Sequence, residues 1–228
     1  MFDRLGVDCV LDVGAMDGRY GEMLRGIGYR GPILSFEPVA RNLDLLERKV
    51  AGDPLWTVVP LALGSADEER TIHVLSATNF SSLLPINPYG RRSFPGETDK
   101  TSEEVVTIRR LDGLMPELTS VPDDSSIFLK LDTQGYDLEV LAGAAGCLDR
   151  VVGLQIEMSL KPIYSGMPDM TEALTALREL GFDPTGVSSP RRYPNQSKAA
   201  AEPSRRVISH AGHWKEKMYP KPWSKTPR

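Results

Sequence analysis

Short apolar runs alternate along the chain with segments whose apolar residues recur at helical spacing. The runs are nearly continuous and rich in Val, Ile, Leu and Phe, which is typical of strands covered on both faces in a parallel sheet. The predicted strands are Cys9–Val13, Ile33–Phe36, Trp56–Ala62, Ile127–Leu131 and Val151–Met158.

Four segments between or after these runs have one apolar helical face. The residues on the four faces are Tyr20/Met23/Leu24/Ile27, Val39/Leu43/Leu46/Val50, Leu138/Leu141/Ala142/Ala145 and Met170/Ala173/Leu174/Leu177. Strands that alternate with helices predict an α/β fold, with an open, doubly wound and mostly parallel sheet.

Residues 64–126 interrupt this alternation and predict a β-rich insertion. Thr71–Leu75 and Glu104–Ile108 alternate as half-buried strands do, and Leu111–Leu118 has the pattern of a short helix. A loop rich in Pro, Gly and Asn, Ser76–Ser102, joins the two strands. Long loops in compact domains are usually functional or disordered, so we expect this one to form a flexible lid.

The bulk composition describes one globular domain. With 228 residues, 40% hydrophobic and 25% charged, the chain can bury one good core. We find neither an apolar run of membrane-spanning length nor an N-terminal signal segment. Cys9 and Cys147 are far apart and lack ligand or disulfide spacing, which favours a reducing, cytoplasmic setting. No cluster of His, Asp or Glu has metal-ligand spacing, so we predict no required metal.

Charge divides the chain into an acidic domain and a basic tail. Residues 188–228 hold ten Lys/Arg and two Asp/Glu, a balance of +8, which leaves −12 on residues 1–187 within the net charge of −4. An acidic domain argues against nucleic-acid binding. We predict the tail, with six prolines and no strand or helix period, to be disordered.

Two interpretations of the tail stay open. One is that a reading-frame shift has replaced the C-terminus, in which case the sheet has lost its outer strands. The other is a genuine tail whose basic residues, Trp214 and Trp223 touch an anionic lipid surface, a peripheral membrane contact.

The first predicted strand ends in a glycine turn. Gly14, Met16 and Gly18 stand at alternate positions, so the middle glycine of a dinucleotide fingerprint is missing. An acidic residue, Asp12, followed by G-x-x-x-G is instead typical of S-adenosylmethionine sites. Glu37, at the end of the second strand, has the position of a carboxylate that accepts hydrogen bonds from both ribose hydroxyls.

Both features have a purely structural alternative. The glycines could simply make a tight turn between strand and helix. Glu37 could cap the helix predicted at 39–50, since Pro38 beside it is a typical helix-starting residue.

Taken together, the motifs resemble the FkbM-family methyltransferases. The pieces that match, in order, are VLDVGAMDG (10–18), SFEP (35–38), PLALGSADEE (60–69), NFSSLL (79–84), FLKLDTQGYDLEVLAGA (128–144) and LQIEMSL (154–160). The resemblance implies a class I, Rossmann-like fold and S-adenosylmethionine-dependent O-methylation. The acceptors it implies are hydroxyls of sugars, polyketides and glycolipids or glycans.

The resemblance also implies roles for individual residues. The methionine side of the cofactor would be lined by Asp12, Gly14, Ala15, Asp17 and Gly18. Glu37 would bind the ribose, and Leu61 and Ala62 would flank the adenine. Two departures concern the pocket: Met16 replaces a small polar residue, often Asn, and Thr133-Gln134 replaces a small apolar–acidic pair.

Asp132 and Glu157 are the candidate catalytic residues. They end, or nearly end, consecutive predicted strands, whose carboxyl ends are where open α/β sheets place ligands. Asp132 would orient the acceptor hydroxyl and take its proton, with Glu157 as second choice and Lys130 on the same strand face to tune the charge. Structural alternatives are a helix cap for Asp132 and a strand-end ion pair for Glu157.

We therefore expect a methyltransferase with a small-molecule or lipid-linked glycan acceptor, which Ser81 and Ser82 of the lid would contact. One rival is an NAD-dependent oxidoreductase, which the glycine spacing disfavours. Another is a catalytically weak, truncated remnant that binds the cofactor without turnover.

Overall fold

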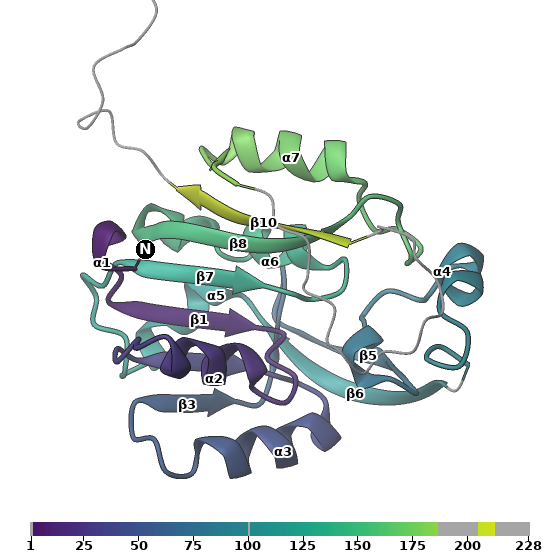
Figure 1. Ribbon diagram of the computed structural model, residues 1–228, viewed down its shortest axis with the longest axis horizontal. Coiled ribbons are helices and arrows are strands. Elements are labelled where there is room, and N and C mark those ends of the chain that lie inside the picture. The colour runs from purple at the N-terminus through teal and green to yellow at the C-terminus, as the bar shows by residue number, and fades with distance from the viewer. Residues whose placement is uncertain (1, 100, 187–204, 213–228) are drawn as a thin grey trace, which may run out of the picture.

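Seven strands form the central sheet of the protein (Figure 1). The computed structural model describes residues 2–99 and 101–186, together with the backbone of residues 205–212. Across the sheet, the strands are β3 (Trp56–Val59), β2 (Ile33–Phe36), β1 (Cys9–Val13), β7 (Ile127–Leu131), β8 (Val151–Ser159), β10 (Arg205–Gly212) and β9 (Asp183–Pro184). The first five are parallel, and β10 is antiparallel to both of its neighbours.

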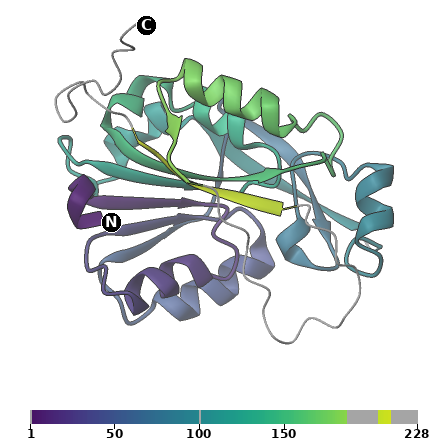
Figure 2. The same cartoon turned by 45° about the horizontal axis from the view of Figure 1, so that its top comes forward.

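Helices cover both faces of this sheet, which confirms the predicted α/β class (Figures 1 and 2). On one face lie α1 (Phe2–Leu5), α2 (Arg19–Gly26) and α3 (Ala40–Val50). On the other lie α5 (Leu111–Leu114), η2 (Met115–Glu117), α6 (Asp137–Ala142), η3 (Ala145–Arg150) and α7 (Met170–Glu179). Alternate residues of β1 therefore enter different cores, with Leu11 and Val13 in one and Val10 in the other.

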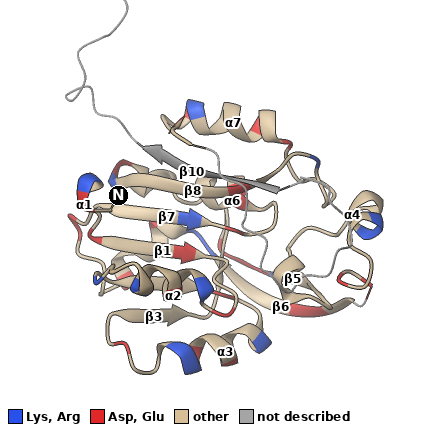
Figure 3. Ribbon diagram, viewed as in Figure 1, with Lys and Arg blue, Asp and Glu red and all other residues tan. Residues whose placement is uncertain are grey.

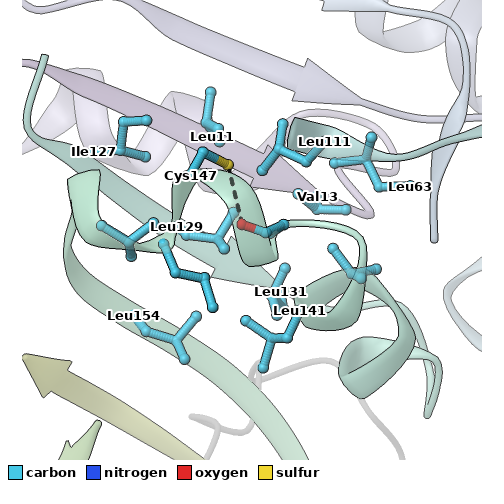
Figure 4. Close-up of a cluster of buried hydrophobic side chains, with 14 of the residues drawn as sticks. Leu11, Val13, Leu63, Leu111, Ile127, Leu129, Leu131, Leu141, Cys147 and Leu154 are labelled. Carbon is cyan, nitrogen blue, oxygen red and sulfur yellow. Dashed lines mark hydrogen bonds between the residues drawn. The ribbon is translucent and has the colours of Figure 1, made fainter. Parts of the chain in front are cut away.

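The larger core lies between the sheet and α5, α6 and α7 (Figure 4). Its side chains are almost all aliphatic, and the Cys147 Sγ donates to the Ala144 carbonyl at 3.2 Å. Burial raises the pKa of the Cys147 thiol to about 11. Cys9 and Cys147 are both free and buried, so each packs as a small apolar residue, as predicted.

The predicted apolar face of α2 is wrong at two of its four positions. Met23 and Ile27 are 47% and 68% exposed, whereas Leu24 is buried. The helix instead approaches β3 through Gly21, where an added Cβ would come within 2.1 Å of the Trp56 ring. Because the indole fills the space beside a glycine, the buried stripe runs through Gly21 and Leu24.

A second sheet forms the predicted insertion. Its strands, in spatial order, are β4 (Ala62–Leu63), β6 (Thr101–Arg109) and β5 (Glu68–Leu75). Between β5 and β6, the chain forms η1 (Thr78–Phe80) and α4 (Pro88–Ser93). The single strand predicted at 56–62 is wrong, because the chain leaves the first sheet after Val59. Pro60 lacks an N–H donor and so cannot continue the ladder.

A row of polar residues crosses the apolar sheet. Ser35, Asp12, Lys130 and Gln155 are paired in register on β2, β1, β7 and β8. The Trp56 indole donates to Ser35 Oγ at 2.9 Å, and Lys130 Nζ lies 2.9 Å from Asp12 Oδ1. A shift of any strand by one residue would bury these groups without their partners, so the row specifies the register.

The tail contributes one strand to the sheet, where we predicted none. β10 pairs with β8 over Arg205–Ser209, so the prediction of lost outer strands is wrong for these residues. The sequence there includes two β-branched residues, Val207 and Ile208, and β8 offers an edge of backbone groups to pair with. The predictions for residues 187–204 and 213–228, including those for Trp214 and Trp223, lie outside the described residues.

Candidate functional site

An open cleft runs along the carboxyl ends of β1, β2, β7 and β8. It holds about 890 Å³ of empty space, open solvent at its mouth included. Six predicted site residues line it: Gly14, Glu37, Leu61, Ala62, Asp132 and Glu157. The other four, Asp12, Ala15, Asp17 and Gly18, lie outside its lining.

Gly14 sits where the end of β1 contacts the end of β7. Its φ is +74°, and an added Cβ would lie 2.2 Å from the Asp132 carbonyl oxygen. A side chain at this position would therefore push apart the two strand ends that carry the cleft. Gly18, at φ +78°, precedes α2, and a Cβ there would meet Leu46 of α3 at 2.6 Å. Both glycines are thus required for packing.

The Glu37 side chain is buried and oriented by three donors. Oε2 accepts from the Met16 N–H at 2.7 Å, and Oε1 accepts from the Val39 N–H at 2.9 Å and from Asn42 Nδ2 at 3.2 Å. Burial raises the pKa of this carboxyl, although the three hydrogen bonds oppose the shift. The N-cap residue of α3 is Val39, and this helix has no side-chain capping hydrogen bond, so Glu37 is not its cap. The Glu37 carboxylate lines the cleft.

Asp12 is fully buried beneath the turn and paired with Lys130. Burial alone would lower the pKa of Lys130, but the charges of Asp12 and Asp132 outweigh it and raise that pKa. Lys130 Nζ also donates to the Gly14 carbonyl at 3.0 Å, so it joins β7 to the glycine turn. Figure 3 shows the acidic and basic positions side by side near the ends of β1 and β7.

The neighbouring residues of the turn, 15–17, make the following contacts. Ala15 is buried in the α2–α3 core. Asp17 forms an ion pair with Arg19 at 2.8 Å. Met16 lines the cleft and has a φ of +52°, a left-handed conformation that is uncommon for a residue with a long side chain.

The two candidate catalytic carboxylates meet at one amide. Gln134 Nε2 donates to Asp132 Oδ1 at 2.8 Å and to Glu157 Oε2 at 3.0 Å. Lys130 Nζ is 3.8 Å from Asp132 Oδ2. The structure thus brings Asp132 and Glu157 together, as their positions at the ends of neighbouring strands predict.

The turn that carries Gln134 is held from two sides. Asp137 of α6 accepts from the backbone N–H and the hydroxyl of Thr133, at 3.0 and 2.9 Å. Burial raises the pKa of Asp137 to about 6. From the insertion, Ser82 Oγ donates to the Gln134 carbonyl at 2.8 Å.

Sequence reasoning missed Asn42, Gln134 and Asp137 as parts of the site. Gln134 and Asp137 lay within a matched motif. Gln134 contacts Glu157 and Ser82, which are distant in sequence, whereas Asp137 contacts the nearby Thr133. Asn42 carried a usable signal. It is a polar residue on the otherwise apolar face of α3, five residues after Glu37.

The insertion supplies the remaining wall of the cleft, with Thr78, Asn79, Ser81, Ser82 and Leu83. Ser82 and His73 exchange backbone hydrogen bonds, which fix this segment to β5. The wall therefore offers hydroxyl and amide groups opposite the sheet.

Within residues 2–99 and 101–186, no group of three or more His, Cys, Asp or Glu is arranged to hold a metal ion. Nor does any described helix have the length and apolar character needed to cross a membrane.

The family model described as "Methyltransferase FkbM domain" matches residues 12–184. A search of curated proteins finds no match. The methyltransferase FkbM from Methylobacillus flagellatus KT is similar in structure, with a TM-score of 0.50 and 16% identity. The match covers 89% of this chain and 43% of that chain, so this chain spans less than half the length of that protein.

Two further solved structures are similar at lower scores. TehB from Haemophilus influenzae has a TM-score of 0.49 at 8% identity, covering 92% of this chain and 59% of that chain. Magnesium protoporphyrin IX methyltransferase from Synechocystis PCC 6803, solved with bound S-adenosylmethionine, has a TM-score of 0.46 at 12% identity, covering 92% and 72%.

Proposed function

The chain belongs to the FkbM methyltransferase family, and we propose that it transfers a methyl group from S-adenosylmethionine to a hydroxyl of a sugar, glycolipid, glycan or polyketide. The observation that supports this most directly is one cleft with two chemically different ends. A buried carboxylate, Glu37, lies at one end, and a pair of carboxylates, Asp132 and Glu157, lies at the other.

The residues at the Glu37 end fit a nucleoside. Among the described contacts, Glu37 Oε2 accepts one hydrogen bond, and a carboxylate oxygen can accept a second, as from a ribose hydroxyl. Val39, Leu61 and Ala62 provide an apolar wall for a purine ring. Lys130 holds the Gly14 carbonyl in place beside them, and Asp12 acts through Lys130.

The proposed cofactor-binding residues fall into two sets. Gly14, Glu37, Leu61 and Ala62 would contact S-adenosylmethionine. Asp12, Ala15, Asp17 and Gly18 would shape the turn from outside the cleft.

S-adenosylmethionine supplies a methyl carbon already activated by the sulfonium. The protein then has to align the acceptor oxygen with that carbon and exclude water, which in well-oriented systems contributes about 7–11 kcal/mol. In this proposal the hydroxyl proton goes to Asp132, and its 37% exposure and its hydrogen bond from Gln134 support that role. Such a base adds about 10²–10⁴-fold. Glu157 stands beside it as the second carboxylate.

The insertion forms the proposed acceptor wall. Thr78, Asn79 and Ser81 are uncharged hydrogen-bonding residues, which suit an acceptor that carries many hydroxyls. In this proposal the segment acts as the lid over the acceptor, and the acceptor is a small molecule or a lipid-linked glycan.

Calorimetry with S-adenosylhomocysteine tests the donor site. We expect binding by the full chain and none with NAD. Glu37→Gln should weaken binding at least tenfold, because a ribose hydroxyl loses a charged acceptor and a hydrogen bond to a charged group contributes about 1.5–3 kcal/mol.

Glu47→Gln is the matched control, since Glu47 is exposed on α3 and away from the cleft. It should bind like the wild type. Heat with NAD but not with S-adenosylhomocysteine would make the protein an oxidoreductase candidate instead.

A further inference from the structure

Gln134 occupies a position that neither the family match nor the proposed chemistry assigns. Its amide nitrogen contacts both acidic residues at the acceptor end of the cleft, at 2.8 Å for Asp132 and 3.0 Å for Glu157. Its amide oxygen lies 3.0 Å from the Tyr164 hydroxyl. Tyr164 is buried, and its hydroxyl also lies 2.8 Å from the Phe80 carbonyl in η1.

These partners define the orientation of the amide. Ionised carboxylates only accept hydrogen bonds, so the side that faces Asp132 and Glu157 must be the NH₂ group, which has one hydrogen for each. The oxygen then faces the phenol, whose hydrogen Gln134 shares with the Phe80 carbonyl. A flipped amide would place its oxygen against two negative charges.

The backbone of Gln134 is strained. Its φ is +55°, in the left-handed region that residues other than Gly, Asn and Asp rarely adopt. The contact from Ser82 to its carbonyl and those from Thr133 to Asp137 hold the turn in this conformation. Backbone strain of this kind persists where surrounding contacts over-determine a position, and it concentrates at functional sites.

The charges around the amide explain why a neutral donor suits this position. Two carboxylates within reach of one nitrogen repel each other, and an N–H donor to each of them offsets that repulsion. Lys130 Nζ lies 3.8 Å from Asp132 Oδ2 on β7, and it is also paired with Asp12 of β1. Asp137 of α6 adds negative charge near Asp132, and Tyr164 faces the amide from the other side.

We propose that Gln134 is a positioning residue: its amide holds Asp132 and Glu157 as an ionised pair and fixes the direction in which Asp132 meets the acceptor hydroxyl. This inference rests on the proposed function for the identity of the acceptor. The ionised pair itself is a property of the protein alone. Through Tyr164, the side-chain amide of Gln134 is connected to Phe80 of the insertion, and Ser82 of the insertion donates to the Gln134 backbone carbonyl. The lid and the carboxylate pair therefore share one residue.

The side-chain carboxyl ¹³C signals of Asp132 and Glu157, followed against pH by NMR, test the proposal without an acceptor. Asp132→Asn and Glu157→Gln assign the two signals. In Gln134→Leu, we expect the pKa of at least one carboxyl to rise by about one unit, and in Gln134→Glu by more, because a third negative charge enters the cluster.

Gln134→Gly distinguishes the effect of losing the side-chain amide from the effect of backbone strain. Glycine adopts φ +55° freely, so this variant should unfold at a higher urea concentration than Gln134→Leu and still show the raised carboxyl pKa. Glu47→Gln is the control here as well, because Glu47 is exposed on α3 and away from the cleft, and it should leave both titrations unchanged.

If the carboxyl pKa values of Asp132 and Glu157 in both Gln134→Leu and Gln134→Gly equalled those of the wild type, the proposal would be overturned. Binding of S-adenosylhomocysteine is measured on the same samples. If the wild type did not bind S-adenosylhomocysteine, the proposed function would be contradicted, but the conclusion on Gln134 would still hold. With an identified acceptor, the Gln134 variants should lower kcat while the KM for S-adenosylmethionine stays near the wild-type value.

Discussion

Two residues of the cleft, Met16 and Gln134, have left-handed backbone conformations without being glycine. In both, the left-handed backbone accompanies a contact with a carboxylate of the cleft. The Met16 N–H donates to Glu37, and the Gln134 turn points an amide at two carboxylates. Both residues depart from the FkbM sequence pattern. Their shared conformation was not predictable from the sequence, because φ depends on contacts from distant strands.

Met16→Asn should stabilise the protein by about 0.5–1 kcal/mol. A left-handed conformation costs an ordinary residue about 1–2 kcal/mol, and asparagine tolerates it better. The urea midpoint measures the change. Met16→Ala is the control, since it removes the same side chain but keeps the strain. An equal gain for alanine would show that the side chain, and not the backbone, is responsible.

At the scale of elements, the apolar runs of β1, β2, β7 and β8 were predictable because each is covered by helices on both faces. Strand β3 was predictable only in part, since the apolar run continues through Pro60 while the chain changes sheets. The buried face of α2 was predicted wrongly, because it depends on a glycine that makes room for Trp56 from another strand. A contact between a glycine and a residue of a distant strand does not show in the spacing of apolar residues along the helix.

The polar row across the sheet leads to a prediction for Lys130→Met. The variant leaves Asp12 buried without its cation, which typically costs about 3–5 kcal/mol of unfolding free energy. The double variant Asp12→Leu/Lys130→Met should recover much of that loss. Urea unfolding measures both.

Lys49→Met provides the comparison for Lys130→Met. Its partner Glu22 is 66% exposed, and such pairs contribute about 0–1 kcal/mol. If Lys130→Met cost no more than Lys49→Met, the ion pair would have no role in holding the sheet.

For the whole molecule, the sequence predicted the fold class, the insertion and both ends of the cleft, but not the outer edge of the sheet. Strand β10 follows a long segment without periodicity, and its pairing depends on the edge that β8 presents. The cleft assembles from two sheets. Glu37, which lines it, and Asp137, which holds the turn of Gln134, have raised pKa values because they are buried. Such acids connect the stability of the whole fold to pH.

Asp137 makes that connection testable. Its pKa rises from 3.8 to about 6 on folding, so its stabilising contribution is complete below the unfolded value and is lost as pH rises through about 6. Asp137→Asn removes this loss while keeping an oxygen for Thr133. The gain of the variant over the wild type should be larger at pH 7.5 than at pH 4.5 by about 2 kcal/mol. Urea unfolding at the two pH values measures it, and a gain independent of pH would contradict the assignment.

The residues that begin and end the long connection between β5 and β6 already face each other, since Leu75 is paired with Thr101. A connection closed at its base can change in length or composition while β5 and β6 stay paired, provided that its Ser82 and Phe80 contacts with Gln134 and Tyr164 are kept. The donor end of the cleft has no such freedom, because its parts come from several strands locked in register. In the proposed function, swapping residues 76–100 between relatives would therefore change the acceptor end of the cleft and leave the donor end as it is.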